Sequence, residues 1–235
     1  MKKFLWVIGF VALVSFGASA QYHYAFYYDA TGGQDLEIDL INTVGFSNDY
    51  IISIYDADGY ELWSTSGTLA GYASAAAVVG QLVGDSDYAW GVVTVDSEYQ
   101  LLIGLEYALN GQLVSINTIY DEVPLLDPEL PFWLGAYYTQ YGAAETAFII
   151  MNPWNVYAAC TVTAYNAEGT IVYTRDFDLV PFESYYVDLA TVMGSGNLLW
   201  GLLDVQMEGA SVILALEYYR DGGSLEIDNV TEYYY

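Results

Sequence analysis

The sequence contains one pattern twice, about 110 residues apart. When residue i is placed over residue i + 110, Trp90-Gly91 meets Trp200-Gly201 without a gap. One extra residue near Gly209 moves the register to i + 111, where Leu105-Glu106-Tyr107 meets Leu216-Glu217-Tyr218. A repeat of this length is a domain-sized unit, whereas repeats of about 20 to 50 residues must stack to fold. The sequence therefore predicts two similar domains in tandem.

The first 20 residues have the three parts of an export signal. Lys2 and Lys3 precede the apolar stretch 4–16, and Ala18-Ser19-Ala20 is a small-residue cleavage site. We expect cleavage between Ala20 and Gln21 and a secreted protein, extracellular or periplasmic. No later run of about 20 apolar residues follows, so no membrane insertion is expected.

The mature chain is strongly acidic. Without the signal it has no Lys, and Arg175 and Arg220 face 30 Asp and Glu residues, a formal charge of −28. Nucleic acids and anionic lipids are bound through Lys and Arg, so nucleic acid is excluded as a partner. The acidity fits either solubility in salty or acidic surroundings or the binding of divalent cations.

Stability has to come from packing, because Cys160 is the only cysteine and no internal disulfide can form. Cys160 shares one face of an alternating segment with Val156, Ala158, Val162 and Ala164, which predicts a small core residue.

Periodicity after residue 21 indicates β-strands. The segment 35–42 alternates Leu36, Ile38 and Leu40 with acidic residues, the pattern of a strand with one wet face. Seven or eight short strands per repeat, separated by Gly, Asn and Asp turns, predict an all-β protein of two tandem antiparallel β-sandwich domains. We place them at 21–120 and 132–235. The segment 72–79 could pass for a helix, but its counterpart 182–189 reads as a strand, so we predict strand for both.

The segment 121–131 joins the two repeats and holds three of the five prolines. Prolines at this spacing favour a stiff, extended connector, so we expect a preferred orientation of the two domains.

The second repeat resembles a known family. The segments Ala147-Phe-Ile-Ile-Met-Asn-Pro153, Ala159-Cys-Thr-Val-Thr-Ala-Tyr165, Val180-Pro181 and Val212-Ile-Leu-Ala-Leu-Glu-Tyr218 are similar to an uncharacterised bacterial extracellular β-sandwich repeat. The strand order is also similar to that of the transducer protein of a microbial sensory rhodopsin. The resemblance implies a β-sandwich in a surface or secreted setting, and it implies no reaction.

Catalytic groups are scarce. His23 is the only histidine and lies near the mature N-terminus, where we expect fraying, so a Ser-His-Asp site or a zinc site is not expected. Glu106 and Glu217 could form a glycosidase pair, but such carboxylates share one cleft, and equivalent residues of two separate sandwiches rarely do. We predict that the protein is not an enzyme and that these are strand carboxylates bonded to neighbouring Tyr or backbone groups.

Calcium is the ion that the carboxylates favour, and it is the one cofactor considered. The candidate ligands are Asp56 and Asp58 in the first hairpin, Asp85 and Asp87, and Asp121 and Glu122. Asp-x-Asp-Gly is also an ordinary turn sequence, and that interpretation is preferred for the hairpin.

Aromatic residues are the remaining resource for binding. Adjacent tyrosines on a strand point to opposite faces, so one of each pair faces outward or into an interface. The candidate ligand-binding residues are Trp90, Trp200, Tyr138 and Tyr219. Core packing is preferred for both tryptophans because Val92 and Leu202 lie on the same side.

These features predict a non-catalytic structural or adhesive protein of the cell surface or matrix, with self-association or matrix components as partners. A carbohydrate-binding protein that stacks polysaccharide on exposed aromatics is the first alternative. An outer-membrane β-barrel is the second, although Asn229 and Thr231 interrupt the alternation expected of a last barrel strand.

Overall fold

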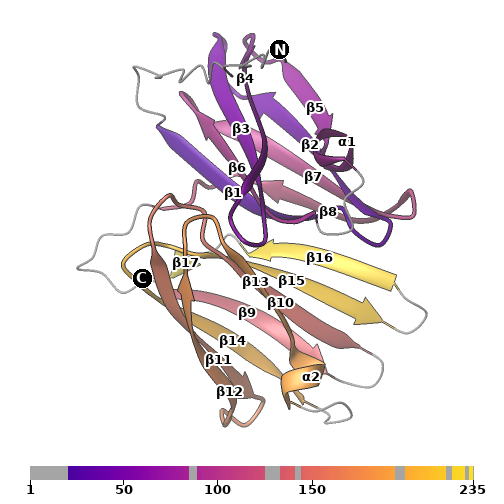
Figure 1. Cartoon of the computed structure of the whole chain (residues 1–235), viewed down its shortest axis with the longest axis vertical. Coiled ribbons are helices and arrows are strands. Elements are labelled where there is room, and N and C mark those ends of the chain that lie inside the picture. The colour runs from indigo at the N-terminus through magenta and orange to yellow at the C-terminus, as the bar shows by residue number, and fades with distance from the viewer. Residues whose placement is uncertain are drawn as a thin grey trace, which may run out of the picture.

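The computed structural model describes residues 21–84, 89–124, 133–140, 144–193, 199–220, 224–230 and 233–234. The predicted export signal lies outside these residues. Each repeat forms two antiparallel sheets packed face to face, and Figure 1 shows the first repeat above the second. The predicted all-β sandwich architecture is confirmed.

The first repeat contains sheets A and B, whose strands are given in their spatial order. Sheet A consists of β1 (Tyr22–Asp29), β6 (Trp90–Ser97), β3 (Asn48–Asp56) and β4 (Glu61–Leu69). Sheet B consists of β5 (Ser74–Val78), β2 (Gln34–Asn42), β7 (Leu101–Leu109) and β8 (Gln112–Ile119).

The second repeat contains sheets C and D in the same topology. Sheet C consists of β12 (Ile171–Leu179), β11 (Ala158–Asn166), β14 (Leu199–Glu208), β9 (Trp133–Gln140) and β17 (Tyr233–Tyr234). Sheet D consists of β13 (Ser184–Asp188), β10 (Glu145–Met151), β15 (Ile213–Arg220) and β16 (Ser224–Val230).

Among the described residues, each repeat also has one helical turn at the same place. These are α1 (Val79–Val83) and α2 (Leu189–Met193), which directly follow β5 and β13. The strand prediction for 72–79 and 182–189 is therefore right for most of both segments and misses the first helical residue. Within the described part of the chain, no helix is long and apolar enough to cross a membrane.

A buried asparagine holds the same turn together in both repeats. The Asn42 side-chain amide donates to the carbonyls of Phe46, Leu69 and Ala70, at 2.7, 3.3 and 2.9 Å. The Asn152 amide donates to the equivalent carbonyls of residues 156, 179 and 180 at 2.7, 3.4 and 2.9 Å. One amide thus links three carbonyls of each turn, and those of Ala70 and Val180 also accept the backbone amides of Ala73 and Glu183.

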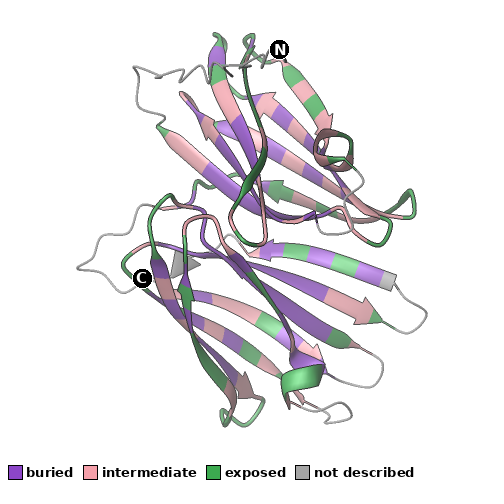
Figure 2. Cartoon of the chain, in the orientation of Figure 1, coloured by how far each residue is buried: buried purple, intermediate pink, exposed green. Residues whose placement is uncertain are grey.

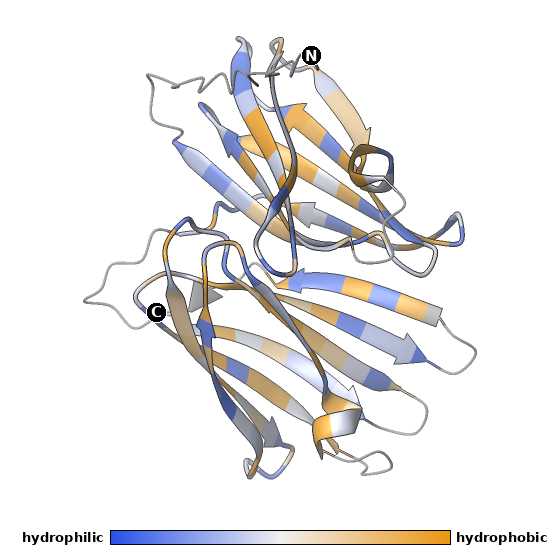
Figure 3. Cartoon of the chain, viewed as in Figure 1, coloured by the Kyte–Doolittle hydropathy of each residue, from blue (hydrophilic) through white to orange (hydrophobic). Residues whose placement is uncertain are grey.

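Alternation along the strands builds the cores. Figures 2 and 3 show buried and exposed residues, and apolar and polar ones, alternating along β16. In β1 both faces are buried: Tyr24, Phe26 and Tyr28 pack in the first core, while Ala25 and Tyr27 face the other way. The Tyr24 hydroxyl accepts a hydrogen bond from the Leu101 amide of the opposite sheet at 2.9 Å.

The core of the first repeat continues into the second. Sheet D has two apolar faces: one packs on sheet C through Phe148, Ile150, Leu214 and Leu216. Its outer face joins the hydrophobic cluster of the first repeat through Ile149, Met151, Ile213, Ala215, Leu225 and Ile227. β16 lies along β8 at this junction (Figure 1). The outer face of sheet D therefore closes the β1 and β8 side of the first sandwich.

Candidate functional site

The outer face of sheet C presents a group of apolar and aromatic side chains. Register places Tyr137 of β9 beside Leu202 of β14, and Leu202 beside Tyr165 of β11, so the three form a row across the sheet. Residues an even number of positions away on the same strands, including Trp133 and Trp200, point to the same side. We call this surface the aromatic face: Trp133, Tyr137, Tyr165, Trp200, Leu202 and Asp204.

The aromatic face is open to solvent. Tyr137 is 54% exposed, Trp200 48% and Leu202 47%, and the Tyr137 and Trp200 ring centroids are 6.4 Å apart. A hollow of about 340 Å³ on this face is lined by Trp133, Gly135, Ala136, Tyr137, Leu202 and Asp204. Exposed apolar groups that are contiguous and bordered by polar ones mark interaction sites on soluble proteins.

The same positions in the first repeat are covered by the second repeat. The equivalent row is Tyr27, Val92 and Tyr55, across β1, β6 and β3. The Tyr27 hydroxyl donates to Glu217 at 3.0 Å, and Tyr55 stacks on Phe182 with centroids 3.9 Å apart. The rows are equivalent in sequence and opposite in environment.

The two tryptophans differ for the same reason. Trp90 is half-buried and meets the edge of Tyr186 at 6.3 Å between centroids, so it packs at the junction of the repeats and not inside a sandwich. Trp200 lies on the open aromatic face. The prediction of core packing is wrong for Trp200, because Leu202 beside it is itself exposed.

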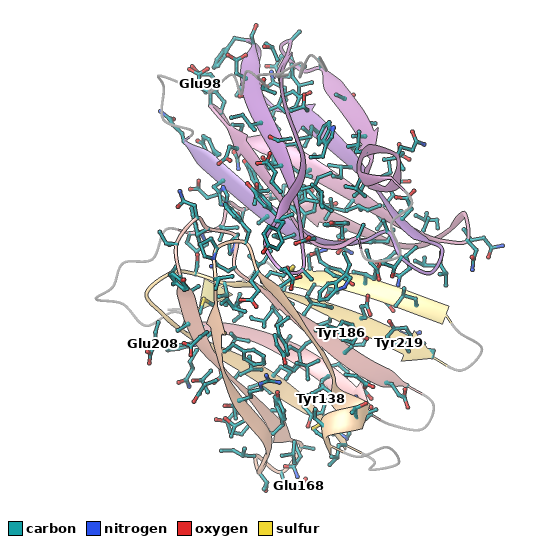
Figure 4. The ribbon with its side chains drawn as sticks, in the orientation of Figure 1. Glu98, Tyr138, Glu168, Tyr186, Glu208 and Tyr219 are labelled. Atoms are coloured by element: carbon teal, nitrogen blue, oxygen red, sulfur yellow. The ribbon has the colours of Figure 1, made fainter. Side chains whose placement is uncertain are left out.

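A buried carboxylate lies at the junction of the repeats. Glu217 of β15 is buried and accepts hydrogen bonds from the hydroxyls of Tyr27 and Tyr219. Desolvation by burial raises the pKa of Glu217 above its usual range, against the lowering effect of the tyrosine hydrogen bonds. Tyr186 and Tyr219 lie near each other over sheet D (Figure 4).

Further polar groups extend this junction cluster. Asn229 donates to the Tyr107 hydroxyl at 2.7 Å, and its side-chain oxygen accepts the Tyr27 amide at 2.9 Å. Asp29 accepts from the Thr31 amide and the Gln34 side chain, and burial raises its pKa. No Lys or Arg takes part among these contacts, so the junction is held by neutral donors around two carboxyl groups.

The predicted tyrosine ligands lie elsewhere than expected. Tyr138 points between sheets C and D, fully buried, and its hydroxyl has no hydrogen-bond partner among the described residues. Its neighbour Tyr137 is the outward member of the pair, so the choice of Tyr138 as a surface ligand is wrong. Tyr219 is half-buried in the junction cluster, where it donates to Glu217.

His23 is firmly placed, contrary to the expected fraying. Its Nδ1 lies 2.8 Å from Asp96, its Nε2 lies 3.1 Å from the Pro153 carbonyl, and its ring stacks on Trp154 at 4.4 Å. The second repeat thus holds the N-terminal strand. With both ring nitrogens engaged, His23 serves as a contact between the repeats.

The calcium candidates of the first hairpin form a turn. One oxygen of Asp56 accepts the amides of Asp58 and Tyr60, at 3.0 and 2.9 Å. Across the described residues, no three His, Cys, Asp or Glu side chains gather to hold a metal ion. Asp85 and Asp87 lie outside the described residues, so calcium binding there stays a prediction.

The two equivalent glutamates do not share a site. Glu217 is buried in the junction, as predicted for a strand carboxylate bonded to tyrosine. Glu106 lies on the outer face of sheet B, where register places it directly beside Glu37.

Comparisons with known proteins give little further guidance. No family model matches the chain, and neither does any curated protein. Among solved structures, it is similar to a protein from Bacteroides fragilis described as a β-galactosidase, at 13% identity and a TM-score of 0.18, over 88% of this chain and 32% of that one. A β-glucuronidase of glycoside hydrolase family 2 shares 9% identity, with a TM-score of 0.21, over 88% and 23% of the two chains. A Bacteroides uniformis β-glucuronidase shares 12% identity, with a TM-score of 0.19, over 90% and 25%.

The chain spans about a third or less of the length of these glycosidases. At such low TM-scores the likeness carries no argument about activity. The resemblance to an extracellular β-sandwich repeat likewise stays a prediction.

Proposed function

We propose that this protein is a non-catalytic, secreted structural or adhesive component of a cell surface or matrix, and that it binds its partner through the aromatic face. One observation carries the proposal: Tyr137, Trp200 and Leu202 are about half exposed, whereas the equivalent side chains of the first repeat are covered by the second. An aromatic row that is a contact surface in one repeat has the chemistry of a contact surface in the other. Tyr and Trp suit this use because they combine apolar area with a polar tip.

The groups that could do chemistry support a non-catalytic assignment. His23 is engaged at both nitrogens, Cys160 is buried with its pKa raised to about 12, and Glu217 is enclosed by tyrosines. None of these groups opens onto the hollow of the aromatic face.

Carbohydrate binding is a second candidate for the same surface. Sugar rings stack on exposed aromatic rings, and Asp204 beside the hollow offers oxygen acceptors for hydroxyl groups. Tyr137 and Trp200 are tilted by 42° to each other, which gives two ring surfaces of different orientation.

The experiment compares two exposed-residue variants of residues 21–235. Leu202→Glu places a charge in the middle of the aromatic face, and Val192→Glu places the same charge on α2, away from it; both positions are about half exposed. Binding to polysaccharides on a glycan array, and self-association by size-exclusion chromatography with light scattering, are measured with and without calcium. We expect Leu202→Glu to lose the wild-type interaction and Val192→Glu to keep it. Equal behaviour of the two variants contradicts the proposal.

A further inference from the structure

We propose that molecules of this protein associate head to tail, with the outer face of sheet B of one copy packed on the aromatic face of the next. The inference rests on the proposed function and names the partner of the aromatic face as a second copy of this chain. Its basis is the internal repeat: both halves of the contact that joins the two repeats are present a second time, exposed, at opposite ends of the molecule.

The accepting half of the contact is the aromatic face. In the first repeat the row Tyr27, Val92 and Tyr55 receives the second repeat. In the second repeat, Tyr137 and Leu202 take the same register positions with their apolar area exposed.

The donating half is an outer sheet face. In the second repeat this is sheet D, where Ile227 is 1% exposed because it packs on the first repeat. In the first repeat it is sheet B, where the equivalent Ile116 is 62% exposed. Glu106 takes the register position of Glu217, opposite Ile116 as Glu217 is opposite Ile227. Sheet B therefore has a carboxylate, Glu106, at the position where the Tyr137 hydroxyl of another copy could donate to it. Tyr27 donates to Glu217 in the same way within the chain.

A turn beside the donating face repeats as well. Phe182 stacks on Tyr55 from a left-handed backbone conformation with φ of 62°, and the next residues continue the contact through the Ser184 amide, which donates to the Ala57 carbonyl at 3.0 Å. The equivalent Tyr72 has φ of 61° and is 75% exposed. A bulky residue in a left-handed conformation is uncommon outside positions that need it.

The receiving site for that turn is also present and open. A side chain at Gly59 would meet the Pro181 carbonyl at 2.3 Å, because the turn of the second repeat lies against it. At the equivalent Gly169 there is nothing within 4 Å. The hairpin of the second repeat therefore has the space that the turn at Tyr72 of another copy would fill.

The two free faces are different surfaces of one molecule, so their contact is heterologous. Such a contact does not close on itself after two copies unless rotation brings the ends together, and it generates rings or open filaments. Association of this kind fits a structural protein.

Acidic side chains on both faces regulate the contact. Glu37 and Asp39 take the places of Ala147 and Ile149 on the donating face, beside Glu106. On the accepting side, Asp204 takes the place of Thr94. The neighbouring edge strand β16, which is the equivalent of β8, carries Asp228 and Glu226, and Glu226 pairs with Arg220 at 3.0 Å. Repulsion among these carboxylates opposes association at neutral pH and low salt, and acid or divalent cations relieve it.

The first test transplants the donating surface of the second repeat onto the first. The double variant Glu37→Ala/Asp39→Ile, in residues 21–235, carries the residues of positions 147 and 149. We expect concentration-dependent oligomers at neutral pH by light scattering, and their loss when Leu202→Glu is added. Val192→Glu, added instead, leaves them intact. A double variant that stays monomeric, or oligomers that survive Leu202→Glu, overturns the inference.

The second test fixes the register. Tyr72→Cys and Tyr165→Cys are made in separate chains of the double variant, because these positions are equivalent to the stacked pair Phe182 and Tyr55. Buried Cys160, with its pKa raised to about 12, does not compete for the disulfide. We expect the mixture to form a disulfide dimer at least about tenfold faster than either variant alone, as higher effective concentration implies. Equal rates overturn the inference.

The same variants separate this inference from the proposed function. If the double variant stays monomeric while wild-type protein binds a polysaccharide and Leu202→Glu does not, the partner is a glycan and the aromatic face is still the binding surface. If Leu202→Glu changes neither association nor glycan binding, the proposed function fails as well.

Discussion

Tyr55 and Phe182, one from each repeat, stack face to face with ring centroids 3.9 Å apart and ring planes 6° apart. The stack ties the first hairpin to the turn that precedes β13, and the hydrogen bond from Ser184 to Ala57 lies beside it. Its sequence equivalents, Tyr165 and Tyr72, lie on different ends of the molecule. The molecule therefore forms this contact once between its own repeats. The equivalent residues, Tyr165 and Tyr72, are left available for the same contact between two molecules.

Neutralising Glu217 is expected to stabilise the protein at neutral pH. Burial raises the pKa of this carboxyl group, so the folded state holds its proton more tightly than the unfolded chain. That contribution is complete below the unfolded pKa, about 4.3, and is lost as the pH rises through the folded pKa. Glu217→Gln keeps one acceptor oxygen for the two tyrosine hydroxyls, replaces the other oxygen by an NH2 donor and removes the charge. Removing the charge gains about 1.4 kcal/mol per unit of pKa shift.

The measurement is the melting temperature of wild type and Glu217→Gln from acid to neutral pH. The two curves meet at low pH and separate with the variant higher as the pH rises. Glu106→Gln, at the equivalent half-buried position outside the junction, serves as the control and leaves the curve unchanged. A Glu217→Gln variant that melts below wild type at neutral pH contradicts the assignment.

The two equivalent tryptophans are expected to respond differently to truncation. Trp200 is about half exposed on the aromatic face, so Trp200→Ala leaves the free energy of unfolding within about 0.5 kcal/mol of wild type. Trp90 packs at the junction of the repeats, and Trp90→Ala costs about 2 kcal/mol, less than the 3 to 5 kcal/mol of a fully buried Trp. Urea unfolding of both variants checks the difference, and equal costs would rule out the asymmetric environments.

Each buried turn asparagine is expected to be essential to its own repeat. Asn42→Ala or Asn152→Ala leaves three backbone carbonyls without their side-chain donor, at a cost of about 2 to 3 kcal/mol. Thermal melts report the loss. Asn166→Ala, in an exposed hairpin where the side chain caps two amides, is the milder comparison.

Separated repeats are expected to bind each other. Residues 132–235 alone would expose Ile149, Met151, Ile213 and Ala215, which complete the core of the first repeat. We expect each half to melt at a lower temperature than the whole chain, and a mixture of 21–120 with 132–235 to recover stability in near-ultraviolet circular dichroism. Halves that neither associate nor lose stability would show that the shared core contributes nothing. Halves without any cooperative unfolding would show that the two repeats form one folding unit.

Acid is expected to promote association of the whole chain. At a formal charge of −28 after signal removal, molecules repel one another at neutral pH and low salt. Light scattering is followed from pH 7 to about pH 4.5 and on adding calcium at millimolar concentration. A parallel series at physiological salt, where the Debye length is about 8 Å, shows how much of the repulsion salt alone screens. Scattering that rises in wild type and stays flat in Leu202→Glu agrees with head-to-tail contact. A flat signal in wild type removes charge as the control of assembly.

The sequence predicts which residues share a face of each strand, but it says less about which faces are covered by another sheet or domain. Period two correctly groups Trp200 with Leu202 and Asp204, but it does not say whether a second domain lies over that group. Tyr137 and Tyr138 are indistinguishable by residue type, and only the register of β9 decides which one faces the opposite sheet. His23 looked exposed to fraying because its partners, Pro153 and Trp154, come from the other repeat.

One signal of the asymmetry was present in the sequence. Glu37 and Asp39 of the first repeat align with Ala147 and Ile149 of the second, at positions on the same side of equivalent strands. Alternation places these positions on an outward face, and apolar residues there in the second repeat indicate that this face is covered within the chain in the second repeat and not in the first. Glu217 could not be separated from Glu106 in the same way, because both lie between Leu and Tyr.

The first core continues into sheet D, so the interface between the two repeats is formed within one polypeptide and does not need high affinity to persist. Two domains held on one polypeptide meet at an effective concentration in the millimolar range, whatever the concentration of the protein outside. A contact that joins free domains only at high concentration is therefore saturated within the chain. The same geometry between separate molecules lacks that advantage, so it responds to crowding at a surface, to acid and to cations, while the fold itself remains insensitive to dilution.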